Sequence, residues 1–523
     1  MSFNDDEEIV SNANATENVG DEFTMGKIKF RIVNAAKAPL EESKLTVLLE
    51  LTGQANEEDR RRGLDLVTVL DVSGSMKGDR IEKLKKAMEF VVKKLSPIDR
   101  LSIITFSGSA NRLCPLRRIT ENSKTDIINL ISKIAAAGAT NITDGLQKAL
   151  QVLNDRRFKE GRSIGVMLMS DGEQNAGGDA ARVKVSDVPV YTFGFGTGGQ
   201  NPKAMADVST NSPVSFNYQP DYVQNTTDLS VAFANCLGGL LTVTVQDLRL
   251  TISPEGNTTI ESVSAGDYPQ TTDNSSAVTV RFGNLYDKET RRVIVDLVLP
   301  EVTSEISSRV LRTGYMYSNG KGKQLQSSPV FASVKRSGSF KEEEEEEVMV
   351  EGSRLQTAKM MKEAREMADK NKLDDAKNII NVDAQSMLED VEVNKNNSVL
   401  EMLKEELDQH MEYLQSPDMY KNHGRSFALS SELCHARQRS AARGKDLDKF
   451  RMFSTPRMDL YKEQAKEFDK NPTKPVPTVE DDVKQEIAAD PLSPIIGPLT
   501  FYLQQAILAL QSIETILTAG GRN

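Results

Sequence analysis

The chain has 523 residues, with 65 Lys and Arg against 76 Asp and Glu, a formal net charge of -11. This length predicts several domains, and the acidic balance argues against nucleic acid or an anionic membrane as the main partner. Cys114, Cys236 and Cys434 are too few and too scattered for a disulfide framework or a structural zinc site. Because neither a secretory signal nor an apolar run of roughly 20 residues is visible, we expect a cytoplasmic protein, with the nucleus left open.

The first part of the chain changes from an acidic segment to alternating strands and helices. Residues 1–25 are polar, acidic and poor in large apolar side chains, which predicts disorder. Two strand-like runs follow, Lys27–Val33 and Leu45–Thr52. Apolar runs then alternate with amphipathic helical segments, beginning with the strand Leu66–Leu70. This alternation predicts right-handed βαβ crossovers and a doubly wound, mostly parallel sheet over residues 62–238.

Beyond Gly238 the pattern changes to short alternating strands bounded by turn residues, which is typical of an antiparallel β-sandwich. The first of these strands is predicted over Leu240–Ser253. The two early strands have no other obvious sheet to join, and unpaired edge strands are a liability. We therefore predict one sandwich from residues 26–53 and 239–340, with the α/β domain inserted in it.

Four further segments are predicted after the sandwich, and they differ mainly in composition. They are an acidic linker over 341–352, a helical region over 353–470, a Pro-rich linker over 471–495 and an amphipathic helix over 496–518. Apolar residues share one face of the last helix, but its glutamines make it a poor membrane span and a good docking helix. This helix could dock on a partner or pack on its own chain, and the sequence does not distinguish the two alternatives.

Five oxygen-bearing residues follow strands or open a helix at one edge of the predicted sheet: Asp71, Ser73, Ser75, Thr140 and Asp171. Open α/β sheets bind their ligands at this edge, just past the carboxyl ends of the strands. Carboxylate and hydroxyl oxygens are hard donors that suit an octahedral divalent ion, Mg²⁺ above all, with Mn²⁺ as an alternative. The sequence therefore predicts a divalent metal site at the end of the sheet.

These segments, in this order and on these elements, resemble the von Willebrand factor type A (VWA) domain and its metal-ion-dependent adhesion site. The resemblance implies that Ser73, Ser75 and Thr140 ligate the ion directly or nearly so. It also implies that Asp71 and Asp171 act mostly through bound waters. The remaining position would then be filled by a Glu or Asp of a binding partner.

Other motifs resemble plant cytosolic VWA proteins that often carry an N-terminal RING finger. Asp65–Met76 and Cys236–Thr242 are similar to their VWA part. Ser430–Gly444 and Thr455–Met458 are similar to the helical Vwaint region that follows VWA in that group. Since no Cys/His spacing here could ligate the two zinc ions of a RING, the ubiquitin-ligase activity of RING-bearing relatives is not carried over.

Several other patterns in the sequence do not indicate a catalytic or cofactor-binding role. Gly194–Gly199 has the spacing of a dinucleotide fingerprint, but it follows a late strand instead of the first βα turn, so we interpret it as a turn. Asp144 is interpreted as an acid in the first turn of a helix and not as part of the metal site. No nucleophile elbow, P-loop or nearby histidine accompanies the predicted site, so no catalytic machinery is visible.

We therefore expect a non-catalytic protein-interaction module that binds an acidic intracellular partner through Mg²⁺. The alternative is a RING-less substrate-binding or scaffold subunit associated with ubiquitin ligation. Under that alternative the chain pairs with RING-bearing relatives, or with itself, through the helix at Leu499–Leu517.

Overall fold

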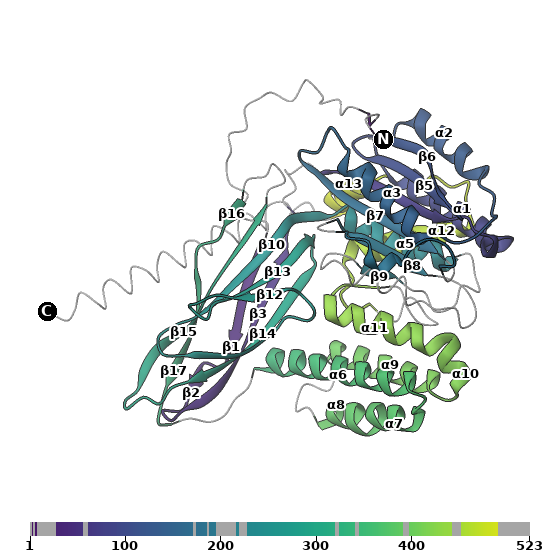
Figure 1. Ribbon diagram of the computed structural model, residues 1–523. Coiled ribbons are helices and arrows are strands. Elements are labelled where there is room, and N and C mark those ends of the chain that lie inside the picture. Colours follow the sequence, from purple (N-terminus) through teal and green to yellow (C-terminus); the bar gives the residue numbers. More distant parts are fainter. Residues whose placement is uncertain are drawn as a thin grey trace, which may run out of the picture.

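The architecture comprises an α/β domain, a β-sandwich and a helical region (Figure 1). The computed structural model describes residues 3, 6–7, 28–55, 61–170, 174–185, 188–194, 216–218, 227–318, 324–339, 345–390, 397–441 and 451–489. Within the described part of the chain, no helix is both long and apolar enough to cross a membrane.

The α/β domain is built on a six-stranded sheet. In spatial order its strands are β6 (Ala110–Arg118), β5 (Arg100–Phe106), β4 (Gly63–Asp71), β7 (Arg162–Ser170), β8 (Val190–Gly194) and β9 (Phe216–Tyr218). All neighbours are parallel except β6, which runs antiparallel along β5 and forms one edge. Every residue of β4 is buried, as a central strand covered on both faces requires.

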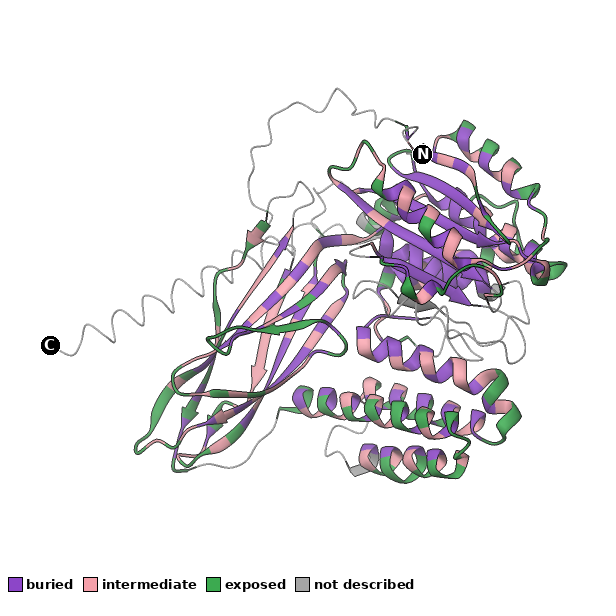
Figure 2. Ribbon diagram, viewed as in Figure 1, coloured by how far each residue is buried: buried purple, intermediate pink, exposed green. Residues whose placement is uncertain are grey.

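Helices cover both faces of this sheet (Figure 1). They are α1 (Asp79–Lys94), α2 (Glu121–Ser132), α3 (Ile142–Asn154) and α5 (Thr227–Leu240). Helices α1, α2 and α5 share one apolar core, whereas α3 belongs to a second. Leu66 of β4 lies in the first core and the adjacent Val67 in the second, which is the period-two alternation of a strand. The strands are accordingly buried throughout the centre of the domain in Figure 2.

The sandwich consists of two largely antiparallel sheets, whose inward side chains make one core. One sheet has the order β1 (Ile28–Asn34), β3 (Ser43–Gly53), β14 (Thr290–Leu299) and β11 (Thr259–Ser264). The other has the order β12 (Gln270–Thr272), β13 (Val278–Tyr286), β10 (Val243–Pro254), β15 (Ile306–Ser318), β17 (Val330–Arg336) and β2 (Lys37–Ala38), with β16 (Gln324–Gln326) beside β15. β3 precedes the α/β domain and pairs along its length with β14, which follows that domain. The predicted fold class, a doubly wound α/β domain inserted in an antiparallel sandwich, is confirmed.

Gly238 and Gly239 lie at the junction between the α/β domain and the sandwich. Helix α5 continues through both glycines and β10 begins only afterwards, so the strand predicted over Leu240–Ser253 starts too early. A Cβ on Gly238 would lie 2.9 Å from the Cα of Met458, in α12 (Pro456–Lys470). The pair therefore allows α12 to approach α5 closely, instead of ending the helix as a turn signal would.

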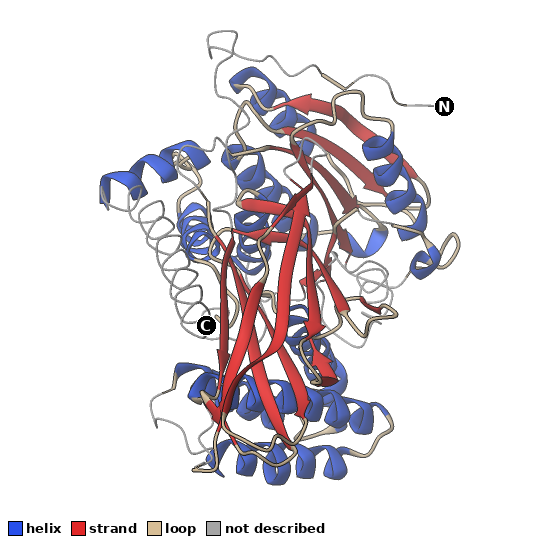
Figure 3. Cartoon of the chain, turned by 90° about the vertical axis from the view of Figure 1, so that its left-hand side faces the viewer, coloured by secondary structure: helices blue, strands red, loops and turns tan. Residues whose placement is uncertain are grey.

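A helical region follows the sandwich in the sequence, and its helices lie beside one end of the strands (Figure 3). It contains α6 (Glu346–Asp369), α7 (Leu373–Asn378), η3 (Ile379–Gln385), α8 (Ser386–Asp390), α9 (Ser398–Tyr413), α10 (Pro417–Met419), η4 (Tyr420–Gly424) and α11 (Arg425–Arg437). The glutamate run predicted as a linker over 341–352 is helical from Glu346 onward. Two contacts explain this: Val348 packs against the sandwich, and Arg31 Nη1 donates to Glu347 Oε1 at 2.9 Å. Acidic residues also favour the first turn of a helix.

Two later helices return to the α/β domain. Helix α12 packs beside α5. Thr455 caps it by accepting a hydrogen bond from the Met458 N–H at 3.3 Å, as the Thr455-Pro456 pair predicts. The amphipathic helix predicted over 496–518 lies outside the described residues.

Helix α13 (Val479–Ala489) lies within the segment 471–495, so the prediction of a linker is wrong for these residues. A buried ion pair accounts for the difference, because Lys94 Nζ of α1 lies 2.5 Å from Asp482 Oδ2 of α13. Both side chains are fully buried, and a buried charge needs such a partner. The stability of α13 therefore comes from a tertiary contact and not from its own sequence.

The prediction of disorder over residues 1–25 is wrong for Phe3, Asp6 and Glu7. These three residues lie against the α/β domain, with Asp6 only 6% exposed.

A buried carboxylate joins the three parts of the molecule. Glu289, between β13 and β14, is 2% exposed, and its Oε1 lies 2.8 Å from Arg291 Nη2 and 3.0 Å from Arg439 Nε. Arg439 follows α11, and its guanidinium lies over the ring of Tyr286, whose hydroxyl is 2.7 Å from that of Tyr191 in β8. Burial would raise the pKa of Glu289, but the charges of the two arginines overcome this and lower it.

We expect Glu289→Gln to lower the free energy of unfolding by roughly 3 kcal/mol, because two buried guanidinium groups lose their counter-charge. Chemical denaturation measures the effect. Since the pKa of Glu289 is lowered in the folded state, the difference from wild type should be full above its ordinary value of 4.5 and shrink as the pH falls below it. The control is Glu261→Gln, whose side chain is 44% exposed, with an expected change within about 0.5 kcal/mol. Equal effects of the two substitutions would contradict this role of Glu289.

Candidate metal centre

The predicted metal site lies where β4 and β7 end, at the carboxyl edge of the parallel strands. Asp71 is the last residue of β4, and Ser170 is the last residue of β7. Ser73 directly precedes the short 3₁₀ helix η1 (Gly74–Met76), which contains Ser75, and Thr140 lies just before α3. The topology therefore brings together four of the predicted residues, because parallel strands end at the same edge.

The Asp71 carboxylate is buried and held by two hydrogen bonds. The backbone N–H of Ser73 donates to Oδ1 at 2.8 Å, and the hydroxyl of Ser170 donates to Oδ2 at 2.5 Å. Asp71 is 0% exposed. Each carboxylate oxygen has a second lone pair, so the two donors fix the orientation of the group without using up its acceptor capacity.

The hydroxyls of Ser73 and Ser75 are hydrogen-bonded to each other, with their Oγ atoms 2.9 Å apart. Ser73 is buried, whereas Ser75 is exposed. For ligands about 2.0–2.1 Å from Mg²⁺, neighbouring corners of the octahedron are about 2.8–3.0 Å apart. The two hydroxyls thus have the spacing of two adjacent ligands of such an ion.

Backbone hydrogen bonds fasten the loops around the site to one another. The Gly74 N–H donates to Gly138 O at 2.9 Å, and the Ala137 N–H donates to Val72 O at 2.7 Å. Gly138 has φ +90°, a left-handed conformation that favours glycine. These contacts place the loop that carries Thr140 directly over the turn that carries the two serines.

Asn175 is a residue of the site that sequence reasoning missed. Its side-chain oxygen accepts from the Thr140 N–H at 2.8 Å, and its own N–H donates to Thr140 O at 3.1 Å. This reciprocal pair positions Thr140. Ser170 is a second residue of the site that the sequence analysis did not include, although it directly precedes Asp171. Asn175 offered no signal, because amides are common in loops.

The sequence analysis also concerned Asp171, a glycine-rich segment and Asp144 near this edge of the sheet. Asp171 lies outside the described residues, as does Phe195–Gly199, most of the glycine-rich segment interpreted as a turn. Asp144 accepts a hydrogen bond from the Ala110 N–H at 2.6 Å and braces α3 against β6, in keeping with its exclusion from the site.

The donor set suits a hard divalent ion. It offers hydroxyl oxygens and one buried carboxylate, the ligand types that Mg²⁺ and Mn²⁺ accept together with water. Among the described residues no cluster of three or more His, Cys, Asp or Glu is arranged to hold a metal. A soft or borderline ion bound by nitrogen and sulfur therefore has no comparable site in that part of the chain.

Comparison with known protein families matches two regions of the chain. The von Willebrand factor type A domain model matches residues 65–231, and the Vwaint model (VWA / Hh protein intein-like) matches residues 385–467. The chain contains a VWA domain followed by a Vwaint region. The VWA domain, a protein-interaction module, corresponds to the α/β domain with the candidate metal centre.

Among curated proteins the chain is similar to plant ubiquitin ligases. It is 30% identical over 266 residues to the Arabidopsis thaliana E3 ubiquitin-protein ligase WAV3, covering 47% of this chain and 32% of that protein. It is 32% identical over 266 residues to the Arabidopsis thaliana E3 ubiquitin-protein ligase WAVH1, covering 48% and 34% respectively. The match thus spans only about a third of the length of either relative.

Two solved structures share the fold at low sequence identity. The von Willebrand factor type A protein from Catenulispora acidiphila has a TM-score of 0.60 at 13% identity, over 79% of this chain and 97% of that one. The ArnB paralog VWA2 from Sulfolobus acidocaldarius has a TM-score of 0.50 at 14% identity, over 78% and 98%. The likeness therefore extends beyond the VWA domain to most of the described architecture.

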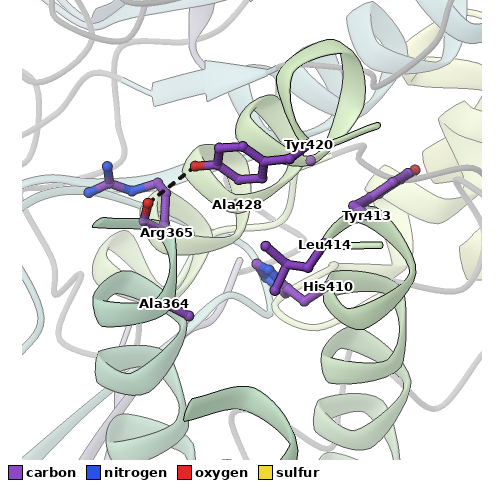
Figure 4. A pocket seen from close by; sticks show the side chains of 8 residues that line it. Ala364, Arg365, His410, Tyr413, Leu414, Tyr420 and Ala428 are labelled. Carbon is purple, nitrogen blue, oxygen red and sulfur yellow. Dashed lines mark hydrogen bonds between the residues drawn. The ribbon is translucent and has the colours of Figure 1, made fainter. Parts of the chain in front are cut away.

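A small pocket in the helical region is a weaker candidate (Figure 4). It lies between α6, α9 and α11 and has room for about one water molecule. The Tyr420 hydroxyl beside it donates to Asp369 Oδ1 at 2.7 Å and lies 3.2 Å from Arg365 O. We interpret this pocket as a packing feature of the helices.

We expect Ser170→Ala to lower the free energy of unfolding by about 2 kcal/mol, because the buried Asp71 carboxylate loses a charge-assisted hydrogen bond. Urea denaturation in a chelating buffer measures this without any contribution from metal. The matched control is Ser109→Ala, an exposed serine in a neighbouring loop, for which we expect a change within about 0.5 kcal/mol. A Ser170→Ala protein as stable as the control would show that the bond does not hold Asp71.

Proposed function

We propose that Asp71, Ser73, Ser75, Thr140 and Asp171 bind Mg²⁺, and that the ion recruits an Asp- or Glu-bearing segment of another protein. The observation that carries this proposal is the pair of serine hydroxyls 2.9 Å apart beside the fixed Asp71 carboxylate. When bound, the ion would supply a concentrated positive charge at the carboxyl edge of the sheet.

The ligand chemistry supports an acidic partner. In this proposal the direct ligands are the neutral hydroxyls of Ser73, Ser75 and Thr140, and Asp71 and Asp171 act mostly through bound waters. No carboxylate of this chain then contacts the ion directly, so much of its charge is left uncompensated. An ion held in this way gains more from an external carboxylate than one surrounded by acidic ligands. We therefore propose a partner that presents a single exposed Asp or Glu to the site.

The proposed role is non-catalytic. The first four hundred residues contain no histidine, so no imidazole from this part of the chain can serve as a general base beside the metal. The Asp71 carboxylate is itself engaged by Ser73 and Ser170. In this proposal the site binds a ligand and performs no reaction on it.

A second candidate function rests on the similarity to WAV3 and WAVH1. Under it the chain acts as a substrate-binding or scaffold subunit associated with ubiquitin ligation, and the VWA domain provides the binding surface. A reconstituted assay with purified E1 and E2 distinguishes this role from an intrinsic ligase. We expect no ubiquitin transfer by this chain alone; transfer would contradict the non-catalytic proposal.

We expect Mg²⁺ and Mn²⁺ to give saturable binding in calorimetric titrations, and the Ser73→Ala/Ser75→Ala variant to lose it because two neighbouring ligands are removed. The matched control is Ser109→Ala, which should bind like wild type. An aspartate-bearing peptide is included in a second titration, since an external carboxylate completes the coordination. Failure of wild type to bind either ion with this peptide present would sink the proposed function.

A further inference from the structure

Three described residues of the short acidic segment ahead of β1, Phe3, Asp6 and Glu7, each contact the VWA domain in a different way. The contacts involve the amino ends of the strands and the edge strand β6. Because Asp71 lies at the carboxyl ends, this surface is separate from the candidate metal centre.

Asp6 is the most extensively bound residue of the segment. Its carboxylate accepts from Arg157 Nε at 3.0 Å, from Arg100 Nη1 at 3.0 Å, and from the backbone N–H groups of Arg157 and Phe158 at 3.1 and 3.4 Å. Burial would raise the pKa of Asp6, but the hydrogen bonds from Arg157 and the charge of Arg100 lower it. The surface is thus built to hold an ionised carboxylate.

The charge balance beneath Asp6 explains why this surface accepts an acid. Asp65 alone is shared by three arginines: Arg100 at 2.7 Å, Arg156 at 2.7 Å and Arg162 at 2.7 Å. The charge of Asp99 also acts on Arg162, but Asp99 is itself paired with Arg61 at 2.7 Å, so these guanidinium groups still outnumber the two carboxylates. An acidic side chain from outside the domain core supplies the missing counter-charge, and Asp6 takes this place.

Phe3 adds an apolar and a cation–π contact. The Arg112 guanidinium lies 4.0 Å from the ring centroid, and the ring packs against the apolar core beneath α3. The Phe3 N–H donates to Asp155 Oδ2 at 2.8 Å. A phenylalanine three residues ahead of the aspartate is therefore recognised separately from the charge.

Glu7 attaches to the sheet itself. Its N–H donates to Leu116 O at 3.1 Å, and the Arg118 N–H donates to its Oε2 at 2.9 Å. Both contacts are made with β6, the antiparallel edge strand. Peptides commonly add to exposed sheet edges in this way, with backbone bonds giving affinity and side-chain pockets giving specificity.

We propose that this surface, the arginine groove, is a docking site for a linear acidic peptide of another protein with the pattern Phe-x-x-Asp-Glu, which displaces the Phe3–Glu7 segment of this chain. The pattern follows from the three contacts: a ring under Arg112, a carboxylate on Arg157 and Arg100, and a glutamate on β6. The chain's own segment acts as an intramolecular competitor. Its tether gives it an effective concentration of up to about millimolar, so it masks the groove against weaker peptides.

The test uses a fluorescent peptide with the sequence MSFNDDEE, the full-length chain and a chelating buffer, so that the candidate metal centre contributes nothing. In the Phe3→Ala/Asp6→Ala variant the competitor is weakened. We expect this variant to bind the peptide at least about tenfold more tightly than wild type in anisotropy titrations. A matched peptide with alanine in place of the phenylalanine and of the second aspartate should not bind.

Two charge-reversal variants locate the binding. Adding Arg157→Glu to the double variant should abolish peptide binding, because the main carboxylate contact becomes repulsive. Adding Arg182→Glu, an 87% exposed arginine elsewhere on the same domain, should leave it unchanged. The proposal would be overturned if the Arg157→Glu substitution left the peptide affinity unchanged. It would also be overturned if a folded double variant did not bind the peptide.

Wild-type protein provides a second readout in case the double variant does not fold. An excess of unlabelled peptide at millimolar concentration should speed hydrogen exchange at residues 3–7, and unchanged exchange would overturn the proposal. A wild-type dimer that dissociates on adding the peptide would assign the groove to a second copy of the chain. That result would overturn the proposal that the docked peptide belongs to a different protein.

Discussion

The architecture depends on the buried carboxylate of Glu289. It lies in the sandwich beside Tyr286, which contacts the VWA domain through Tyr191, and it binds Arg439 from the segment that follows α11. The neighbouring Gln438 extends the joint, because its amide exchanges two hydrogen bonds of 2.7 Å with the backbone of Arg292 in β14. Removing one partner of such a buried charge cluster is strongly destabilising. The three parts are therefore held together here by direct contacts and not only by the chain segments between them.

The two ends of the VWA sheet have opposite chemistry but select the same kind of ligand. At the carboxyl ends, neutral hydroxyls of Ser73 and Ser75 suit an ion that keeps its positive charge. At the amino ends, Asp65 is outnumbered by arginines. In both proposals the ligand supplies an acidic side chain. The net charge of -11 describes the whole surface, whereas recognition depends on local fields, and a protein that is acidic overall can hold two sites for acids.

The features that the sequence predicted correctly depend on residues that lie close together in the chain. Strand and helix periodicity defined the α/β and sandwich parts, and Asp71, Ser73 and Ser75 form one short motif after a strand, so their convergence followed from topology. The failures share one cause, which is partners distant in sequence. Helix α13 depends on Lys94, and Phe3 and Asp6 depend on Arg112, Arg100 and Arg157, none of which a local window includes. The Cys236–Thr242 and Ser430–Gly444 motifs carry the family resemblance, and each contributes a contact near Glu289: the Asp287 N–H donates to Thr242 O at 2.8 Å, and Arg439 binds Glu289 at 3.0 Å.

The insertion of the VWA domain also has a consequence for the order in which the protein is made. β3 is complete at Gly53, but its partner β14 begins only at Thr290. At typical translation rates of about 5 to 20 residues per second, the ribosome needs roughly 12 to 50 seconds to supply that partner. Meanwhile the VWA domain can fold, while the hairpin of β1 and β3 waits with an unpaired edge. The nascent chain thus passes through a stage in which a chaperone would find an exposed strand beside a finished domain.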